Sequence, residues 1–257
     1  MSRRIACVFA HPDDDTYGVG GTLALHAEDD LEITVIMTTS GEAGRILDPS
    51  LATRETLARV REAEDTAAWR ALGLEPELRF LRYPDGGVTD VPRDELVATY
   101  LDVLLDARPQ VVVTFGPDGI TGHEDHVAVG AAATDAFHVA RASGGEGFDR
   151  LLYNAVPRSR MERFNELLRR RGMEPIDPTQ PFQPRGVPDE TIGVLVDCSS
   201  TYERKLAALR EHRTQGELEG LPFDLWPEIL RIEAFVIAHP DRPLGAPVLR
   251  DPLEDLG

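Results

Sequence analysis

Short runs of apolar residues alternate with longer amphipathic stretches along most of this chain of 257 residues, and this alternation constrains the fold more than any other feature. Residues 5–10 and 111–115 are almost continuously apolar, as expected for strands that are buried on both faces of a sheet. Strands that alternate with helices form a parallel sheet that the helices cover. We therefore predict an α/β fold: a doubly wound, mostly parallel, Rossmann-like sheet with helices on both faces.

The remaining elements follow from the same periodicities. Further strands are expected at residues 31–38, 78–81, 151–156 and 192–196, and helices at residues 18–26, 51–72, 94–107, 125–142, 157–171 and 201–213. Gly73 ends the second of these helices, because glycine is the usual residue just after a helix. Residues 225–238 fit a helix or a strand equally well. We expect one domain over residues 1–257, with a loop or lid at 175–190 and an irregular, proline-rich tail at 240–257.

Charge and composition argue against several classes of function. The net charge is −18, so a phosphate backbone would be repelled and nucleic-acid binding is disfavoured. No apolar run approaches the roughly 18 residues of a membrane span, and the first run is too short for a signal peptide. We therefore expect a cytoplasmic protein that does not bind membranes. Cys7 and Cys198 lie in or beside apolar runs and are expected to be buried free thiols.

Two short segments concentrate carboxylates and imidazoles directly after two of the predicted strands. Residues 10–15 read Ala-His-Pro-Asp-Asp-Asp, and residues 122–126 read Gly-His-Glu-Asp-His. Ligands of a parallel sheet bind outside the carboxyl ends of its strands, so these distant segments can meet in one crevice. For either segment alone, solvated or helix-capping acids are the alternative. Their equivalent positions after two strands favour a shared site.

These side chains supply the groups of a metal-assisted hydrolase. Two imidazoles from two segments and one carboxylate form a three-ligand site with open positions, the pattern of catalytic zinc, although iron(II) would accept the same ligands. A bound divalent ion lowers the pKa of its water toward about 7 and polarises a carbonyl. Asp13 can then accept the proton of the water, and a histidine outside the metal site can donate to the leaving amine or stabilise the oxyanion. A neighbouring carboxylate such as Asp125 can orient that histidine.

Several motifs, in order, resemble those of the PIG-L/LmbE-like deacetylases, which include the N-acetylglucosaminyl-phosphatidylinositol de-N-acetylases and the bacterial deacetylases of mycothiol and bacillithiol synthesis. Ala-His-Pro-Asp-Asp is followed by Gly-x-Gly-Gly-Thr from Gly18 and by Thr-Ser-Gly-Glu from Thr39. Later come Gly-His-x-Asp-His-x-x-x-Gly, which ends at Gly130, and Lys-x-x-Ala-Leu-x-x-His-x-x-Gln over residues 205–215. The resemblance covers roughly residues 4–215. It implies a zinc-dependent hydrolysis of an N-acetyl group on a glucosamine-type sugar.

The resemblance also implies roles for individual residues. Three of them would bind zinc: His11, Asp14 and His126. Asp13 would be the general base. His123 would protonate the amine or support the oxyanion, with Asp125 tuning it.

Two further assignments from the resemblance concern the sugar. Arg61 matches the arginine that holds the sugar or its aglycone, with a salt bridge to Glu64 or another acid as the alternative. Asp85, in Tyr-Pro-Asp-Gly-Gly, is similar to the aspartate that hydrogen-bonds sugar hydroxyls, with a simple turn role as the alternative. The family pattern also places His212 near the site, where packing is the alternative.

The chain departs from the family pattern at three positions. Asp15 stands where glutamate is frequent, and Glu124 stands where proline is frequent; neither change touches the metal residues. Thr121 stands where the mycothiol-type enzymes carry a tyrosine. This third departure removes a proposed oxyanion partner and argues against a strict assignment to the mycothiol pathway.

We therefore predict a metal-dependent hydrolase that removes an N-acetyl group from a small-molecule amino sugar or its conjugate, and we expect a homo-oligomer, as its relatives often are. An amidase of thiol-sugar conjugates, or an N-acyl deacetylase of a natural product, is the alternative within this class. A non-catalytic, metal-dependent sugar-binding protein is the alternative outside it. The intact Asp13 favours the enzyme, since a binding module needs no base. Loops at residues 45–52, 85–91 and 175–188 would determine the substrate.

Overall fold

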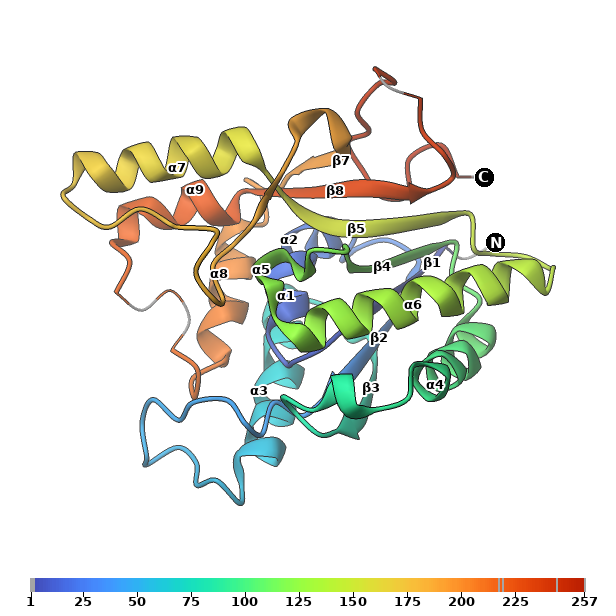
Figure 1. Ribbon diagram of the computed structural model, residues 1–257, viewed down its shortest axis with the longest axis horizontal. Coiled ribbons are helices and arrows are strands. Elements are labelled where there is room, and N and C mark those ends of the chain that lie inside the picture. Colours follow the sequence, from blue (N-terminus) through green and yellow to red (C-terminus); the bar gives the residue numbers. More distant parts are fainter. Residues whose placement is uncertain (1–2, 217, 219, 244, 257) are drawn as a thin grey trace.

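A single sheet of eight strands organises the part of the chain that the computed structural model describes, namely residues 3–216, 218, 220–243 and 245–256 (Figure 1). The strand order is β3-β2-β1-β4-β5-β8-β7, and β6 pairs with β5. The strands are β1 (Arg3–Phe9), β2 (Leu31–Thr39), β3 (Glu77–Tyr83), β4 (Val111–Phe115), β5 (Arg150–Pro157), β6 (Gly186–Val187), β7 (Ile192–Asp197) and β8 (Ile232–His239).

The five strands β3, β2, β1, β4 and β5 are parallel, and their order reverses between β1 and β4. Cys7 of β1 pairs with Val35 of β2 on one side and with Val113 of β4 on the other. Strand β8 runs antiparallel to both β5 and β7. The predicted doubly wound, mostly parallel sheet is confirmed. Ligands of such sheets bind where the strand order reverses, which here is the carboxyl ends of β1 and β4.

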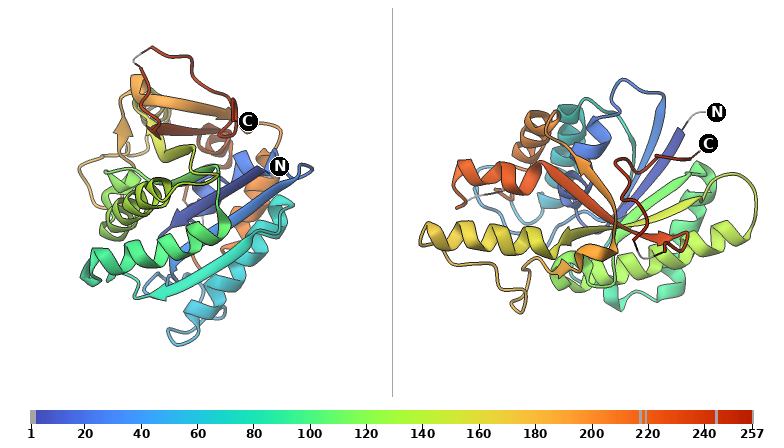
Figure 2. Two further views of the ribbon diagram at one scale, coloured as in Figure 1. Left: turned by 90° about the vertical axis from the view of Figure 1, so that its right-hand side faces the viewer. Right: turned by 90° about the horizontal axis from the view of Figure 1, so that it is seen from above.

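Helices cover both faces of the sheet, as predicted. Helices α4 (Arg93–Ala107) and α6 (Glu124–Ala142) pack together on one face, and α3 (Leu57–Leu72) packs with α8 (Tyr202–Glu211) on the other (Figure 2). The other helices are α1 (Asp14–Gly18), α2 (Gly20–Ala24), α5 (Gly119–Gly122), α7 (Arg158–Arg170) and α9 (Trp226–Leu230), with 3-10 turns at Val88–Asp90, Asp189–Thr191 and Phe223–Leu225. Within the described ranges, no helix is both long enough and apolar enough to cross a lipid bilayer.

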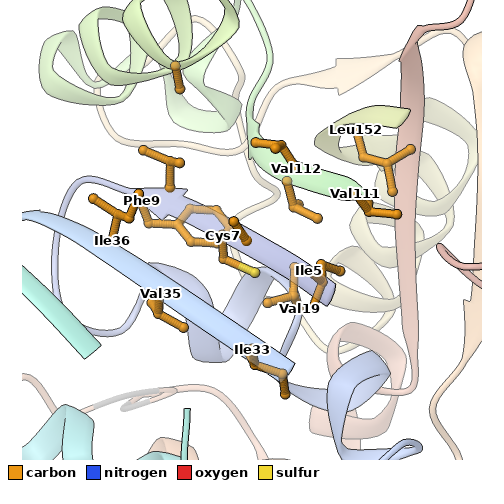
Figure 3. Close-up of a cluster of buried hydrophobic side chains, with 14 of the residues drawn as sticks. Ile5, Cys7, Phe9, Val19, Ile33, Val35, Ile36, Val111, Val112 and Leu152 are labelled. Carbon is orange, nitrogen blue, oxygen red and sulfur yellow. The ribbon is translucent and has the colours of Figure 1, made fainter. Parts of the chain in front are cut away.

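Strand β1 lies at the centre of the hydrophobic core. Its residues from Ile5 to Phe9 are 1% exposed or less, because strands flank it and helices cover both of its faces. The Phe9 ring contacts the Phe115 ring edge to face, with 5.1 Å between the ring centroids. Cys7 and Cys198 are buried free thiols, as predicted. Figure 3 shows the interdigitated side chains of β1, β2 and β4, among them Ile5, Cys7, Phe9, Val35 and Val112.

The helix predicted over residues 18–26 is confirmed only in part, because α2 covers residues 20–24 and a separate short helix, α1, ends just before Val19. Val19 has a φ of −139°, outside the helical region. The amides of Gly21 and Thr22 donate to the carboxylate of Glu233, at 2.8 Å each. A buried carboxylate therefore satisfies N–H groups of the first turn of α2, which a continuous helix would bond internally.

The helix predicted over residues 51–72 begins six residues later than expected, at Leu57. The Thr53 amide donates to Thr56 Oγ1 at 2.9 Å, and the Thr56 amide donates to the Thr53 carbonyl at 3.1 Å. Threonine side chains that bond the local backbone compete with helix formation in this way. At the other end, Gly73 has a φ of 84° and ends the helix as predicted.

Three regions that periodicity describes poorly have definite structures. The ambiguous segment 225–238 divides into α9 and β8. The predicted loop at 175–190 is irregular except for β6 and part of a 3-10 turn. The tail from residue 240 is irregular, apart from a bridge between Leu249 and Val194. Leu244 and Gly257 of this tail lie outside the described residues.

A buried ion pair connects α8 to β8 and to the segment that follows β1. The Lys205 ammonium lies 2.5 Å from Glu233 Oε1 and donates to the Tyr17 carbonyl at 2.7 Å. The side chains of Lys205 and Glu233 are 1% and 2% exposed. Because Glu233 also accepts from the first turn of α2, this pair fixes both short helices beneath the carboxyl end of β1.

Helix α6 approaches β4 very closely at Gly130. A Cβ added to Gly130 would lie 2.5 Å from the carbonyl oxygen of Phe115, a backbone atom that cannot move without shifting the strand. Gly130 lies one helical turn after His126, so the close contact between Gly130 and Phe115 also determines how near His126 lies to the sheet.

We expect the Lys205→Met variant to lose about 3–5 kcal/mol of unfolding free energy, because Glu233 would stay buried and charged without its cation. The double variant Lys205→Met/Glu233→Gln removes both charges and should recover part of that loss. Urea denaturation measures both values. A loss below about 1 kcal/mol in the single variant would show that the pair contributes little to the fold.

We expect the Gly130→Ala variant to unfold at a lower temperature than the wild type. The added methyl group overlaps the Phe115 carbonyl, which costs about 1–3 kcal/mol, and the helix propensity of alanine returns only about 1 kcal/mol. Calorimetric melting tests this expectation. An unchanged or higher melting temperature would show that α6 can move away from β4 at no cost.

Candidate active site

A cavity of about 800 Å³ lies at the carboxyl ends of β1 and β4, and residues of α1 and α5 contribute to its wall. Both segments singled out in the sequence contribute to its wall. Seven of the eight predicted site residues line it: His11, Asp13, Asp14, Arg61, Asp85, His123 and His126. The eighth, Asp125, is 1% exposed and contacts His11. The structure therefore brings all eight predicted residues to one place.

The chain turns sharply between β1 and α1, and this turn presents the first segment to the cavity. Pro12 disfavours a helical conformation at His11, so the helix starts only at Asp14. Asp13 has a φ of 127°, a conformation that residues with a side chain rarely adopt. Backbone strain of this kind costs of order 1–3 kcal/mol and persists where the surroundings hold it. Here it directs the carboxylates of Asp13 and Asp14 to different partners.

Three acceptor groups converge in the cavity. His11 Nδ1 lies 3.2 Å from His126 Nε2, and the Asp14 carboxylate lies 3.3 Å from each of these two nitrogens. One ligand atom from each residue lies within 4.8 Å of the others. The three residues therefore form a cluster that could hold a metal ion.

Hydrogen bonds on the outer side of each imidazole assign the tautomers of this cluster. His126 Nδ1 donates to the Gly119 carbonyl at 3.0 Å, which leaves a lone pair on Nε2. His11 Nε2 faces the carboxylates of Asp85 and Asp125, at 3.0 and 3.3 Å, so it carries the proton and Nδ1 faces the cluster. Two nitrogen lone pairs and a carboxylate pointing at one another fit a divalent cation, and outer carboxylates and carbonyls are the usual supports of metal-bound histidine.

The local electrostatics also favour positive charge at this point. Burial opposes a charged His11, but hydrogen bonds to Asp125, Asp14 and Asp85 outweigh it and raise its pKa well above 6.5. Burial likewise opposes a charged Asp14, but the neighbouring His126 and His11 hold the pKa of Asp14 below its usual 3.8. For His126, burial is the main cause of a pKa below 6.5. Either a proton or a metal ion at this cluster would supply the positive charge that the surrounding carboxylates stabilise.

Arg61 contacts the residue predicted to be the general base. Its guanidinium donates to Asp13 Oδ2 at 2.7 Å, to the Pro12 carbonyl at 2.5 Å and to the Gly41 carbonyl at 2.9 Å. Glu64, the acid considered as its partner, instead accepts from the amide and hydroxyl of Thr214. Arg61 lines the cavity while holding the strained turn that carries Asp13.

Asp125 has different partners from those expected. Its carboxylate accepts from the amides of Gly86 and Val88, at 2.7 and 3.1 Å, and faces His11. Its backbone amide donates to His123 Nδ1 at 3.2 Å, where His123 caps α6. Asp125 therefore orients His123 through its backbone, and the bond places the His123 proton on Nε2. Burial, followed by the charge of His11, lowers the pKa of His123 below 6.5, so the neutral form is favoured.

Asp85 lies in a turn, which was one of the two alternatives, and its side chain also lines the cavity. The turn is closed by the Gly87 amide and the Pro84 carbonyl at 3.1 Å. Asp85 Oδ2 accepts from the Ala43 amide at 2.8 Å, and Oδ1 faces His11 Nε2. Burial opposes a charged Asp85, but the hydrogen bond to His11 and the positive charge of His11 outweigh burial and lower the pKa of Asp85.

Other residues of the region were placed less well by sequence. Phe182 lines the cavity, with its ring centroid 5.2 Å from that of His123. Its only sequence signal is the proline-rich loop that was expected to influence the substrate. His212 is 1% exposed and contacts Thr16 at 3.0 Å, so packing explains it better than substrate contact. Asp15 points into the core, where it accepts from the Trp69 indole at 2.6 Å.

Comparisons with known proteins identify the family to which this chain is similar. The family model for PIG-L, described as GlcNAc-PI de-N-acetylase, matches residues 6–137. A curated relative, the 1D-myo-inositol 2-acetamido-2-deoxy-alpha-D-glucopyranoside deacetylase of Kineococcus radiotolerans, is 34% identical over 276 residues, which are 88% of this chain and 76% of the relative.

Two solved structures share the fold. The N,N'-diacetylchitobiose deacetylase of Pyrococcus horikoshii is 23% identical, with a TM-score of 0.61 over 91% of this chain and 83% of its own. The 4-carboxy-2-hydroxymuconate hydratase GalB of Pseudomonas putida is 18% identical, with a TM-score of 0.61 over 94% and 98%. The second structure shows that this fold also supports chemistry other than amide hydrolysis. The family match and the curated relative together establish that this chain belongs to the PIG-L family.

Proposed function

We propose that this protein is a metal-dependent hydrolase that removes an N-acetyl group from a glucosamine-type sugar or sugar conjugate. The observation that carries the proposal is the convergence of His11, Asp14 and His126 beside Asp13. The names of the Kineococcus relative and of the Pyrococcus neighbour both describe deacetylation of an N-acetylated sugar. These names support the same class of substrate for this chain.

His11, Asp14 and His126 would hold the metal ion, for which we propose zinc, with iron(II) as the alternative. Two imidazoles and one carboxylate with open positions are the ligands of catalytic zinc sites, and iron(II) accepts the same set. When bound, such an ion polarises an amide carbonyl and lowers the pKa of a water molecule. Asp85, Asp125 and the Gly119 carbonyl would orient the two imidazoles from outside.

Asp13 would act as the general base. It lies in the cavity wall directly before Asp14, and its carboxylate is held by the Arg61 guanidinium. We propose that Asp13 accepts a proton from the attacking water and returns it to the nitrogen when the C–N bond breaks. His123, with its proton on Nε2, would donate to the developing oxyanion. Arg61 would act mainly by fixing the position of Asp13.

The polar wall of the cavity would bind the sugar. Arg45, Asp85 and Gln215 line it and offer hydrogen-bonding groups for sugar hydroxyls. The Arg45 guanidinium donates to the Gln215 carbonyl, and the Gln215 amide donates to the Arg45 carbonyl at 3.0 Å, so these two residues hold one another in place. Thr121 also lines the cavity, and its hydroxyl is too short to reproduce the reach of a tyrosine.

The turn at Asp13 favours an enzyme over a sugar-binding protein. A binding module has no need for a carboxylate held by strained backbone and a partly buried ion pair beside the residues proposed to bind metal. Because a hydratase has the same fold, amide hydrolysis by this protein is the first point to test.

We expect the metal-replete protein to release free amine from at least one member of a panel of N-acetylglucosamine glycosides, including an inositol glycoside and N,N'-diacetylchitobiose. The Asp13→Asn variant should keep its metal content, measured by plasma mass spectrometry, and lose about 10²–10⁴-fold in kcat, because it lacks the base. Asp102→Asn, on the exposed face of α4, is the matched control and should keep full activity.

Full activity in Asp13→Asn would refute the assignment of the base. Tight binding of the panel without amine release by the wild type would instead favour a sugar-binding protein.

A further inference from the structure

A second cavity, of about 460 Å³, adjoins the first at the metal-ligating cluster. The two cavities share five lining residues: Asp14, Tyr17, Thr121, His126 and Phe182. The cluster therefore lies at the junction of two spaces, and a ligand positioned at the cluster could extend into both.

The two cavities differ in chemistry. The first is lined by charged and polar side chains such as Arg45, Arg61 and Asp85. The second is mostly apolar, with walls formed by Phe115, Val156, Ile229 and Ile232. The metal-ligating cluster therefore has a polar cavity on one side and an apolar cavity on the other.

Three polar residues line the second cavity but not the first, namely Lys205, Glu233 and Asn154, and all three bond to other protein groups. Lys205 and Glu233 pair with each other, Lys205 also bonds the Tyr17 carbonyl, and Glu233 accepts from two amides of α2. The Asn154 amide donates to the Gly18 carbonyl at 2.8 Å. Because these groups need no ligand partner, the cavity suits an apolar occupant.

The loop around Phe182 lines the junction of the two cavities. The Arg185 amide donates to the Ile120 carbonyl at 2.6 Å, which ties this loop to α5. The Phe182 ring is 66% exposed and belongs to the walls of both cavities. An apolar chain that enters the second cavity would cover part of this exposed ring, and burial of that surface is favourable.

An amide that is hydrolysed at the cluster has two sides, the amine side and the acyl side. The polar cavity fits the amino sugar, so the apolar cavity is left for the acyl side. We propose that the second cavity is an acyl-chain site and that the preferred substrates are glucosamine-type sugars whose N-acyl chain is longer than acetyl. This inference rests on the proposed amide hydrolysis. A cavity within the roughly 300–1,000 Å³ range of ligand sites is far larger than the single methyl group of an acetyl requires.

The test compares N-acetyl-, N-butyryl-, N-hexanoyl- and N-octanoylglucosamine as substrates of the metal-loaded protein. We expect kcat/KM to rise by about fourfold per added methylene until the cavity is full, in line with the free energy of burying a methylene group. Octyl N-acetylglucosaminide carries the same chain on the anomeric oxygen instead, and it should show no such gain.

Two variants change the cavity in opposite directions. Val156→Phe fills it and should lower the octanoyl-to-acetyl ratio of kcat/KM by at least about tenfold, whereas Ile229→Ala enlarges it and should move the optimum to a longer chain. Val139→Phe makes the same exchange on the exposed face of α6, where the residue is 48% exposed, and should leave the ratio unchanged.

Calorimetric titration of the metal-free protein provides a readout without turnover. N-octanoylglucosamine should bind at least about tenfold more tightly than N-acetylglucosamine, and Val156→Phe should abolish the difference.

The outcomes separate this inference from the proposed function. Hydrolysis of the acetyl substrate without any gain for longer acyl chains would refute the acyl-chain site and leave the deacetylase intact. A gain with the octyl glycoside in place of the octanoyl amide would assign the cavity to the aglycone and also refute it. If none of the amides is hydrolysed, the proposed function fails, and this inference fails with it. Should Val156→Phe not fold, an unchanged optimum in Ile229→Ala would be enough to refute the site.

Discussion

The reversal of strand order between β1 and β4 is the constraint on which the rest of the structure depends. Because the chain leaves these neighbouring parallel strands toward opposite faces, the fold leaves a space above their carboxyl ends, and the cavity lies there. Two segments enter that space from either side. The turn into α1 carries His11, Asp13 and Asp14, and the start of α6 carries His123 and His126. The site is therefore built where the fold leaves room, and both segments follow deeply buried strands.

Buried polar contacts convert that position into a defined geometry. Arg61 holds the strained turn at Asp13, while Asp85, Asp125 and the Gly119 carbonyl orient the imidazoles of His11 and His126. Apart from the bond between His126 and the nearby Gly119, each of these contacts joins segments that are distant in the sequence. These outer contacts leave His11 Nδ1, His126 Nε2 and the Asp14 carboxylate facing one another. Three acceptor groups that converge in this way favour a bound cation.

Strands β1 to β5 and β7 and the location of the site could be predicted from the sequence, because buried parallel strands are rich in apolar residues and ligands collect at their carboxyl ends. Strand β6 was expected to be loop, and the segment that holds β8 was left open between helix and strand. Other features could not, because they depend on contacts between distant residues. The break between α1 and α2 requires Glu233 of β8, and the late start of α3 requires a local threonine turn. The carboxylate of Asp125 faces His11, although its nearest histidines in the sequence are His123 and His126. The second cavity combines residues from β4, β5, β8 and α9, so no local pattern could reveal it.

The central claim is that His11, Asp14 and His126 form the metal site. Anomalous diffraction at the zinc edge from crystals equilibrated with zinc tests it most directly. We expect one strong peak at about 2.0–2.2 Å from His11 Nδ1, His126 Nε2 and an Asp14 carboxylate oxygen. A peak bound by His123 and Asp125 instead, or no peak in this cavity at saturating zinc, would contradict the account.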